Sequence, residues 1–70
     1  MSRFKVGKTY IAKVSPKYDF PYTCIMRSGD YAIFRDEFLL ELIMRKPRIV
    51  RGNEQCVMEE GIMLSSINNH

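Results

Sequence analysis

The chain is poor in the residue types that enzymes use most often for catalysis. Its single histidine, His70, is the last residue of the sequence. A general base has to be held in place by neighbouring groups, and we do not expect a terminal residue to be held in that way. The acidic pairs Asp36-Glu37 and Glu59-Glu60 are adjacent residues, whose side chains point apart on a strand. We therefore predict that the chain is not an enzyme and has no cofactor.

Cysteine is equally scarce, which argues against a metal centre. The two cysteines, Cys24 and Cys56, lie far apart in the sequence and form no Cys-x-x-Cys pair. Both occur within apolar, strand-like patterns, so we expect two buried thiols rather than zinc ligands or a disulfide. The run Gly7-Lys8-Thr9 matches the end of a phosphate-binding P-loop, but the glycine that this motif requires five positions earlier is replaced by Ser2. We expect no metal site and no P-loop.

No segment is long and apolar enough to cross a membrane as a helix. The longest apolar block, residues 38–44, is interrupted by Glu41, whereas a membrane-spanning helix needs about 20 apolar residues. The first residues also contain no apolar stretch of the kind found in signal peptides. The sequence predicts a cytoplasmic protein without a membrane partner.

What the sequence does contain fits one small folded domain, residues 1–70. Hydrophobic residues make up 46% and charged residues 27% of the chain, a composition typical of globular proteins. A chain of 70 residues buries only somewhat over half of its unfolded surface, so its core is thin. Contact with a second copy or another partner would add stability.

The pattern along the chain is mainly that of β-strands. The clearest element is a hairpin in which Tyr22–Arg27 and Tyr31–Arg35 flank the turn Ser28-Gly29-Asp30. The same reasoning gives a second hairpin around Gly52-Asn53. The expected strands cover residues 9–14, 22–27, 31–35, 48–51, 54–59 and 62–65.

The segment from Asp36 to Arg45 is ambiguous. Asp36 is a good helix N-cap, Glu41 and Arg45 form a favourable i,i+4 pair, and the apolar residues between them fit one helical stripe. A strand is the competing interpretation, because periodicity cannot settle a short apolar run. We expect a short helix over residues 37–45, ended by Pro47.

The opening Phe4-Lys5-Val6-Gly7-Lys8-Thr9-Tyr10 resembles small β-barrel proteins of bacterial and phage genomes. In those proteins a Val-Gly-Lys-x-Tyr start precedes a tight hairpin and a late cationic strand that ends near a glutamate. The corresponding stretches here are Met26 to Phe34 and Arg48 to Glu54. The resemblance implies an SH3-like barrel or half-barrel of five or six antiparallel strands with one short helical insertion. It implies no particular activity.

The basic residues of the middle of the chain are the first candidate site. The net charge is only +3, so the distribution of charge matters more than its total. Alternation along the first hairpin predicts that Arg27, Arg35 and Tyr31 share a face. An exposed ring among arginines suits the tracking and stacking of a nucleic acid; the alternative is a solvated face that only maintains solubility. The predicted nucleic-acid-binding residues are Arg27, Tyr31, Arg35, Arg48 and Arg51.

The second candidate site is apolar and belongs to a different class of function. Six of the seven residues from Phe38 to Met44 are large and hydrophobic, and an element with one face toward its own core leaves some of them elsewhere. That excess predicts a contact with a protein partner, an inhibited target or a second copy of the chain. The alternative is that the segment is simply core. The predicted partner-binding residues are Phe38, Leu40 and Ile43.

Overall fold

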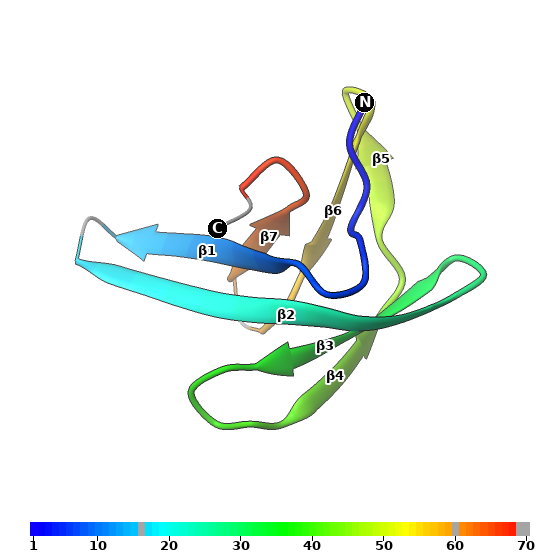
Figure 1. Cartoon of the computed structure of the whole chain (residues 1–70). Coiled ribbons are helices and arrows are strands. Elements are labelled where there is room, and N and C mark those ends of the chain that lie inside the picture. The colour runs from blue at the N-terminus through cyan, green and yellow to red at the C-terminus, as the bar shows by residue number, and fades with distance from the viewer. Residues whose placement is uncertain (16, 60, 69–70) are drawn as a thin grey trace.

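The computed structural model describes residues 1–15, 17–59 and 61–68 and is built from two antiparallel β-sheets (Figure 1). The strands are β1 (Thr9–Ser15), β2 (Tyr18–Ser28), β3 (Tyr31–Asp36), β4 (Leu42–Arg45), β5 (Arg48–Val50), β6 (Asn53–Val57) and β7 (Met63–Ser65). The first sheet has the order β1-β2-β3-β4 and the second β5-β6-β7. The mainly β prediction is confirmed, with seven strands in place of five or six.

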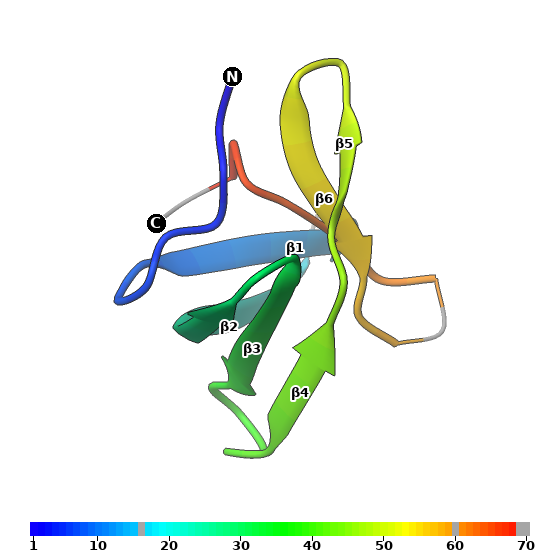
Figure 2. The ribbon, with the colours of Figure 1, turned by 90° about the vertical axis from the view of Figure 1, so that its right-hand side faces the viewer.

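The two sheets meet along β1 and the end of β7. The N–H of Ile11 on β1 donates to the carbonyl of Asn68, just beyond β7, at 2.8 Å. The β5–β6 turn and the β3–β4 loop lie at opposite ends of the molecule in both views (Figures 1 and 2). The chain therefore presents two separate ends, and each is built from one hairpin.

The core lies between the sheets and includes a residue from the segment that precedes β1. Phe4 is buried, and its ring stands edge-on to the rings of Tyr10 and Phe34, with 4.9 Å between centroids in each case. Cys24 and Cys56 are buried and free, as expected, and burial raises the pKa of the Cys56 thiol to about 11. The core residues are Phe4, Tyr10, Ala12, Tyr22, Cys24, Ala32, Phe34, Ile43, Cys56, Met58 and Leu64.

A β-bulge in β2 changes which face of the first sheet each side chain occupies. Cys24 lies opposite Phe34, but Met26 lies opposite Ile33, so Ile25 is an extra residue on β2. An extra residue reverses the alternation of everything beyond it. Arg27 consequently lies opposite the buried Ala32 and on the inner side of the sheet. The prediction that Arg27 shares a face with Tyr31 and Arg35 is wrong for this reason.

The predicted helix over residues 37–45 is also wrong: no helix occurs in the parts of the chain that the structure describes. Asp36 does act as a cap, because its Oδ1 accepts from the N–H groups of Phe38 and Leu39 at 2.8 and 3.1 Å. The N–H of Leu40 then donates to the Asp36 carbonyl at 2.7 Å, as in a helix. Leu40 has φ 58°, however, and this left-handed conformation ends the turn. The residues from Leu42 onward return as β4.

Two further details differ from the sequence-based expectations. The second hairpin turns at Arg51-Gly52, one residue earlier than expected, and both residues have positive φ, 53° and 82°. Strand β2 starts at Tyr18 rather than Tyr22 and therefore includes Pro21. Proline has no N–H group, but the pairing with β1 requires none at this position, because Ile11, the residue opposite, directs its own N–H away from β2 to Asn68.

No described helix is long and apolar enough to span a bilayer. His70 lies outside the described residues.

Candidate functional site

Arg27 is engaged at the junction between the two sheets. Its Nη1 and Nη2 atoms donate to the two carboxylate oxygens of Glu54 on β6, at 2.6 and 2.9 Å. Nη1 also lies 3.2 Å from the carbonyl oxygen of Phe4, while the Phe4 N–H donates to Glu54 Oε1 at 2.7 Å. The side chains of Arg27 and Glu54 are 23% and 4% exposed. Arg27 thus ties β2, β6 and the N-terminal segment together and is not available for a phosphate.

The pKa shifts at this junction agree with the geometry. Burial raises the pKa of Glu54, but the hydrogen bonds from Arg27 and the Phe4 N–H outweigh burial and hold that pKa below its ordinary value. The hydrogen bond to Glu54 raises the pKa of Arg27. Both groups are therefore charged and mutually satisfied at neutral pH, and they present little net charge to solvent.

Arg35 and Tyr31 lie on the outer face of the first sheet. Arg35 donates through Nε and Nη2 to the carboxylate of Glu37, two residues further along the chain. This ion pair is partly exposed, so it neutralises a charge without fixing the fold. Tyr31 is exposed, and on this face it lies opposite Ser28 and two residues before Ile33. The structure does not gather arginines around Tyr31.

The last two predicted nucleic-acid-binding residues belong to the other hairpin. Arg48 is exposed on β5, and Arg51 is exposed at the β5–β6 turn. Neither has an ion-pair partner among the described residues. Of the five predicted residues, the structure thus places Arg27 inside, pairs Arg35 with an acid, and leaves Tyr31, Arg48 and Arg51 exposed without joining them into one site.

The predicted partner-binding residues divide in two. Phe38 and Leu40 are exposed on the β3–β4 loop, at 65% and 68%. Phe38 also touches Phe20, with 6.1 Å between ring centroids. Ile43 is only 8% exposed and lies opposite Phe34 in the core. It does not belong to the surface, because the alternation of β4 turns it inward and turns its neighbours outward.

Those neighbours complete an apolar surface that was only partly predicted. Leu42 and Met44 are 63% and 60% exposed on β4. Met44 lies opposite Ile33, and Ile33 lies opposite Met26, so three apolar side chains form one row across the sheet. Together with the loop these residues make what we call the β4 surface: Met26, Ile33, Phe38, Leu39, Leu40, Leu42 and Met44. Interpretation of residues 41–45 as a strand would have identified Leu42 and Met44.

The β4 surface also has an unpaired strand edge. Strand β4 is last in its sheet, and no strand of the described residues lies along its outer side. Such an edge presents backbone N–H and C=O groups that can pair with another chain. Glu41 and Lys46 are exposed at the two ends of this strand, so the edge carries opposite charges at its two ends.

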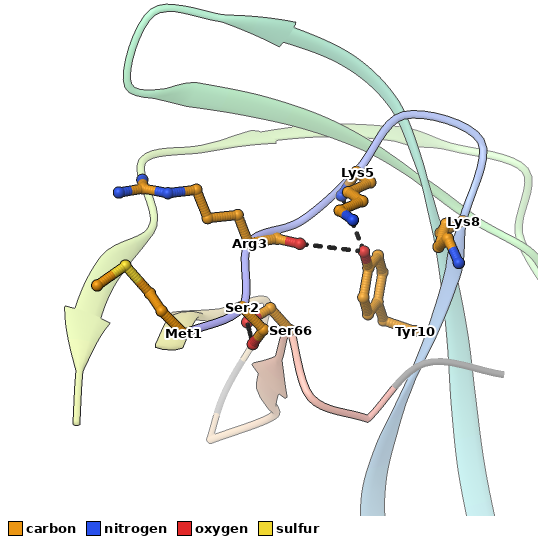
Figure 3. Close-up of a pocket in the computed structure, with 7 residues that line it drawn as sticks. All are labelled: Met1, Ser2, Arg3, Lys5, Lys8, Tyr10 and Ser66. Atoms are coloured by element: carbon orange, nitrogen blue, oxygen red, sulfur yellow. Dashed lines mark hydrogen bonds between the residues drawn. The ribbon is translucent and has the colours of Figure 1, made fainter. Parts of the chain in front are cut away.

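Cations of the N-terminal segment surround a pocket that the sequence analysis did not single out. The pocket has a volume of about 320 Å³ and is lined by Met1, Ser2, Arg3, Lys5, Lys8, Tyr10 and Ser66 (Figure 3). One feature of the sequence could have indicated it: residues 1–18 contain five lysines and arginines and no acid.

Comparison with known proteins gives no match, whether with family models, curated proteins or solved structures. The resemblance to SH3-like barrels therefore stays a prediction. The site has to be interpreted from its own residues.

Proposed function

We propose that the chain is a non-enzymatic protein-interaction domain that uses the β4 surface, and that the partner is a second copy of the chain. The observation that carries this proposal is the exposure of Leu42 and Met44 beside an unpaired strand edge. Soluble domains seldom expose contiguous large apolar side chains without a binding role. A second β4 strand would cover both features at once.

Charge favours a second copy over an unrelated strand. Two copies of β4 that pair antiparallel about Ile43 bring Leu42 of each copy opposite Met44 of the other. The same register sets Glu41 of each copy opposite Arg45 of the other, whose charged guanidinium is held in place by the carbonyl oxygens of Val57 and Met58. Apolar side chains then meet apolar side chains on the outer face, and the two ends of the paired strands carry complementary charge. Strand β4 and the preceding Glu41 therefore supply the groups that a self-complementary interface requires.

The decisive experiment is light scattering in line with size exclusion on the double variant Leu42→Lys/Met44→Lys. Both side chains are mostly exposed, so the fold should survive, while two lysines on each β4 edge should repel the second copy. We expect a concentration-dependent dimer for the natural sequence and a monomer for the variant. The control is Val14→Lys/Ile49→Lys, which adds the same charge at two other half-exposed apolar positions and should remain dimeric.

The register has its own test in the reversal of one charge. Glu41→Lys would place a cation opposite Arg45 of the other copy and should weaken the dimer about five- to tenfold, most strongly at low salt. Asp19→Lys, at an exposed position on β2, makes the same change away from the edge. Equal effects of the two substitutions would exclude this register. A natural sequence that stays monomeric up to about 100 μM, far above the dissociation constants of most specific dimers, would exclude the second copy as the partner.

A further inference from the structure

We infer that the N-terminal pocket binds a phosphoryl group, either that of a free phosphate compound or that of a nucleic-acid backbone. This inference concerns a different surface from the β4 surface and does not depend on the proposed dimer. The volume of the N-terminal pocket, about 320 Å³, lies at the lower end of the range for small-molecule sites. It can therefore hold a phosphate together with part of the compound that carries it.

The charges around the pocket are positive and uncompensated. Arg3, Lys5 and Lys8 are all exposed, and none of them has an ion-pair partner among the described residues. No acidic residue lines the pocket. The acid in this region is Glu54, and both of its carboxylate oxygens already accept hydrogen bonds from Arg27. An anion that enters the pocket thus meets Lys5 and Lys8, with the Arg3 backbone at the wall, and little opposing charge.

The backbone positions Lys5 and Lys8 at the mouth of the pocket. The N–H of Lys8 donates to the carbonyl of Lys5 at 3.2 Å, which closes a tight turn. Gly7 makes this turn possible with φ 89°, a conformation that glycine adopts without strain. The Gly7 N–H donates to the Cys24 carbonyl at 2.7 Å and fastens the turn to β2. Lys5 and Lys8 are therefore presented from a fixed turn, which lowers the cost of ordering them around a ligand.

Tyr10 forms another part of the pocket wall, and its hydroxyl binds the backbone of the N-terminal segment. Its buried hydroxyl accepts a hydrogen bond from the Lys5 N–H at 2.8 Å and lies 3.4 Å from the Arg3 carbonyl, to which it donates. Figure 3 shows Lys5 and Lys8 beside the ring of Tyr10, with Ser2 and Ser66 across from them and the Arg3 guanidinium directed away from the ring. The two serine hydroxyls bond each other, and the Ser2 hydroxyl also donates to Asn53 Oδ1 at 2.9 Å, so the lysines rather than the serines provide the attraction for a phosphate.

The test is an NMR titration of the natural chain with inorganic phosphate and, separately, with a 12-nucleotide single-stranded DNA at low and physiological salt. We expect shifts of the amide signals of residues 3–8. Binding of phosphate alone would assign the pocket to free phosphoryl compounds. Binding of the oligonucleotide alone, with a salt dependence of about two counterions, would assign it to a backbone phosphate. No shift with either ligand at low salt would overturn the inference.

A pair of charge-matched variants separates a site from a general attraction. Lys5→Gln/Lys8→Gln should reduce the affinity for the bound ligand about tenfold or more, because each lost cation removes a phosphate contact. Lys13→Gln/Lys17→Gln removes the same charge at exposed positions outside the pocket and the β4 surface and should reduce affinity less than about twofold. Equal losses in the two variants would overturn the inference, since net charge alone would then account for binding.

Discussion

The two arginine–glutamate pairs of this chain contain the same chemical groups, but their surroundings differ. Arg27 and Glu54 join the two sheets and are largely withdrawn from water. Both also bind the backbone of Phe4, which is 23 residues from Arg27 and 50 from Glu54 in the sequence. Arg35 and Glu37 are neighbours on one strand end and remain partly exposed. The first pair is part of the fold, whereas the second only balances charge. An arginine in a sequence therefore has no fixed role until its face and its partner are known.

Removal of Arg27 should have the largest effect on stability. Arg27→Ala leaves the buried Glu54 carboxylate without its ion-pair partner, a change that typically costs about 3–5 kcal/mol. The whole domain has only roughly 4–10 kcal/mol of stability by the usual scaling with length. We expect the thermal midpoint, followed by circular dichroism, to fall by more than about 12 °C. A cooperative thermal transition close to that of the natural chain would show that the junction contributes little.

The same junction should make the protein sensitive to acid. The pKa of Glu54 is lower in the folded than in the unfolded chain, so the folded state binds fewer protons. The stabilising contribution of the ionised Glu54 is complete above its pKa in the unfolded chain, about 4.3. This contribution is lost as the pH falls through the lower pKa of Glu54 in the folded chain. Urea denaturation between pH 7 and pH 3 should show this loss. In Glu54→Gln the decline should be shallower, whereas in Glu37→Gln, where Arg35 lowers the pKa of an exposed carboxyl, it should change little.

Loss of the cap in the β3–β4 loop should have an intermediate effect. Asp36→Ala removes the oxygen that accepts from Phe38 and Leu39, and comparable capping losses cost about 1–2 kcal/mol. Asp36→Asn keeps an acceptor oxygen and should cost less than half as much. Chemical denaturation of the three proteins measures both values. Equal destabilisation by the two substitutions would mean that charge, rather than the cap, matters here.

Loss of the exposed pair should have the smallest effect. Arg35→Ala removes the hydrogen bonds to Glu37, but water replaces them readily at this position. The thermal midpoint should therefore stay within experimental error of the natural value. A large decrease would contradict the distinction drawn between the two pairs.

Much of the fold could be predicted from the sequence because local signals and burial agree. The hairpin of β2 and β3 follows from two β-prone runs around Gly29, and the burial of the cysteines follows from their apolar flanks. The segment after Asp36 could not be predicted in the same way. Its cap and first turn are helix-like, and only the burial of Ile43 against Phe34, a tertiary contact, selects a strand.

Two details of the candidate sites are wrong for related reasons: the face expected for Arg27, and the choice of Ile43 as an exposed residue. An extra residue at Ile25 turns Arg27 inward, and no turn motif or change in composition announces such a bulge. Likewise, the choice of Ile43 over Leu42 and Met44 depends on strand alternation, which a helical interpretation cannot provide. In both cases the residue types were recognised, and the face they occupy was decided by pairing elsewhere in the sheet.

The buried position of Phe4 has a consequence for folding during synthesis. Its ring is buried among core residues, and the segment around it is fastened to Asn53, Glu54 and Ser66, contacts that span 50 to 64 residues of sequence. During synthesis, the segment around Phe4 therefore cannot complete its contacts until residues 53–66 have emerged from the ribosome. Contacts of such long range slow folding, and the ring of Phe4 stays uncovered until they form.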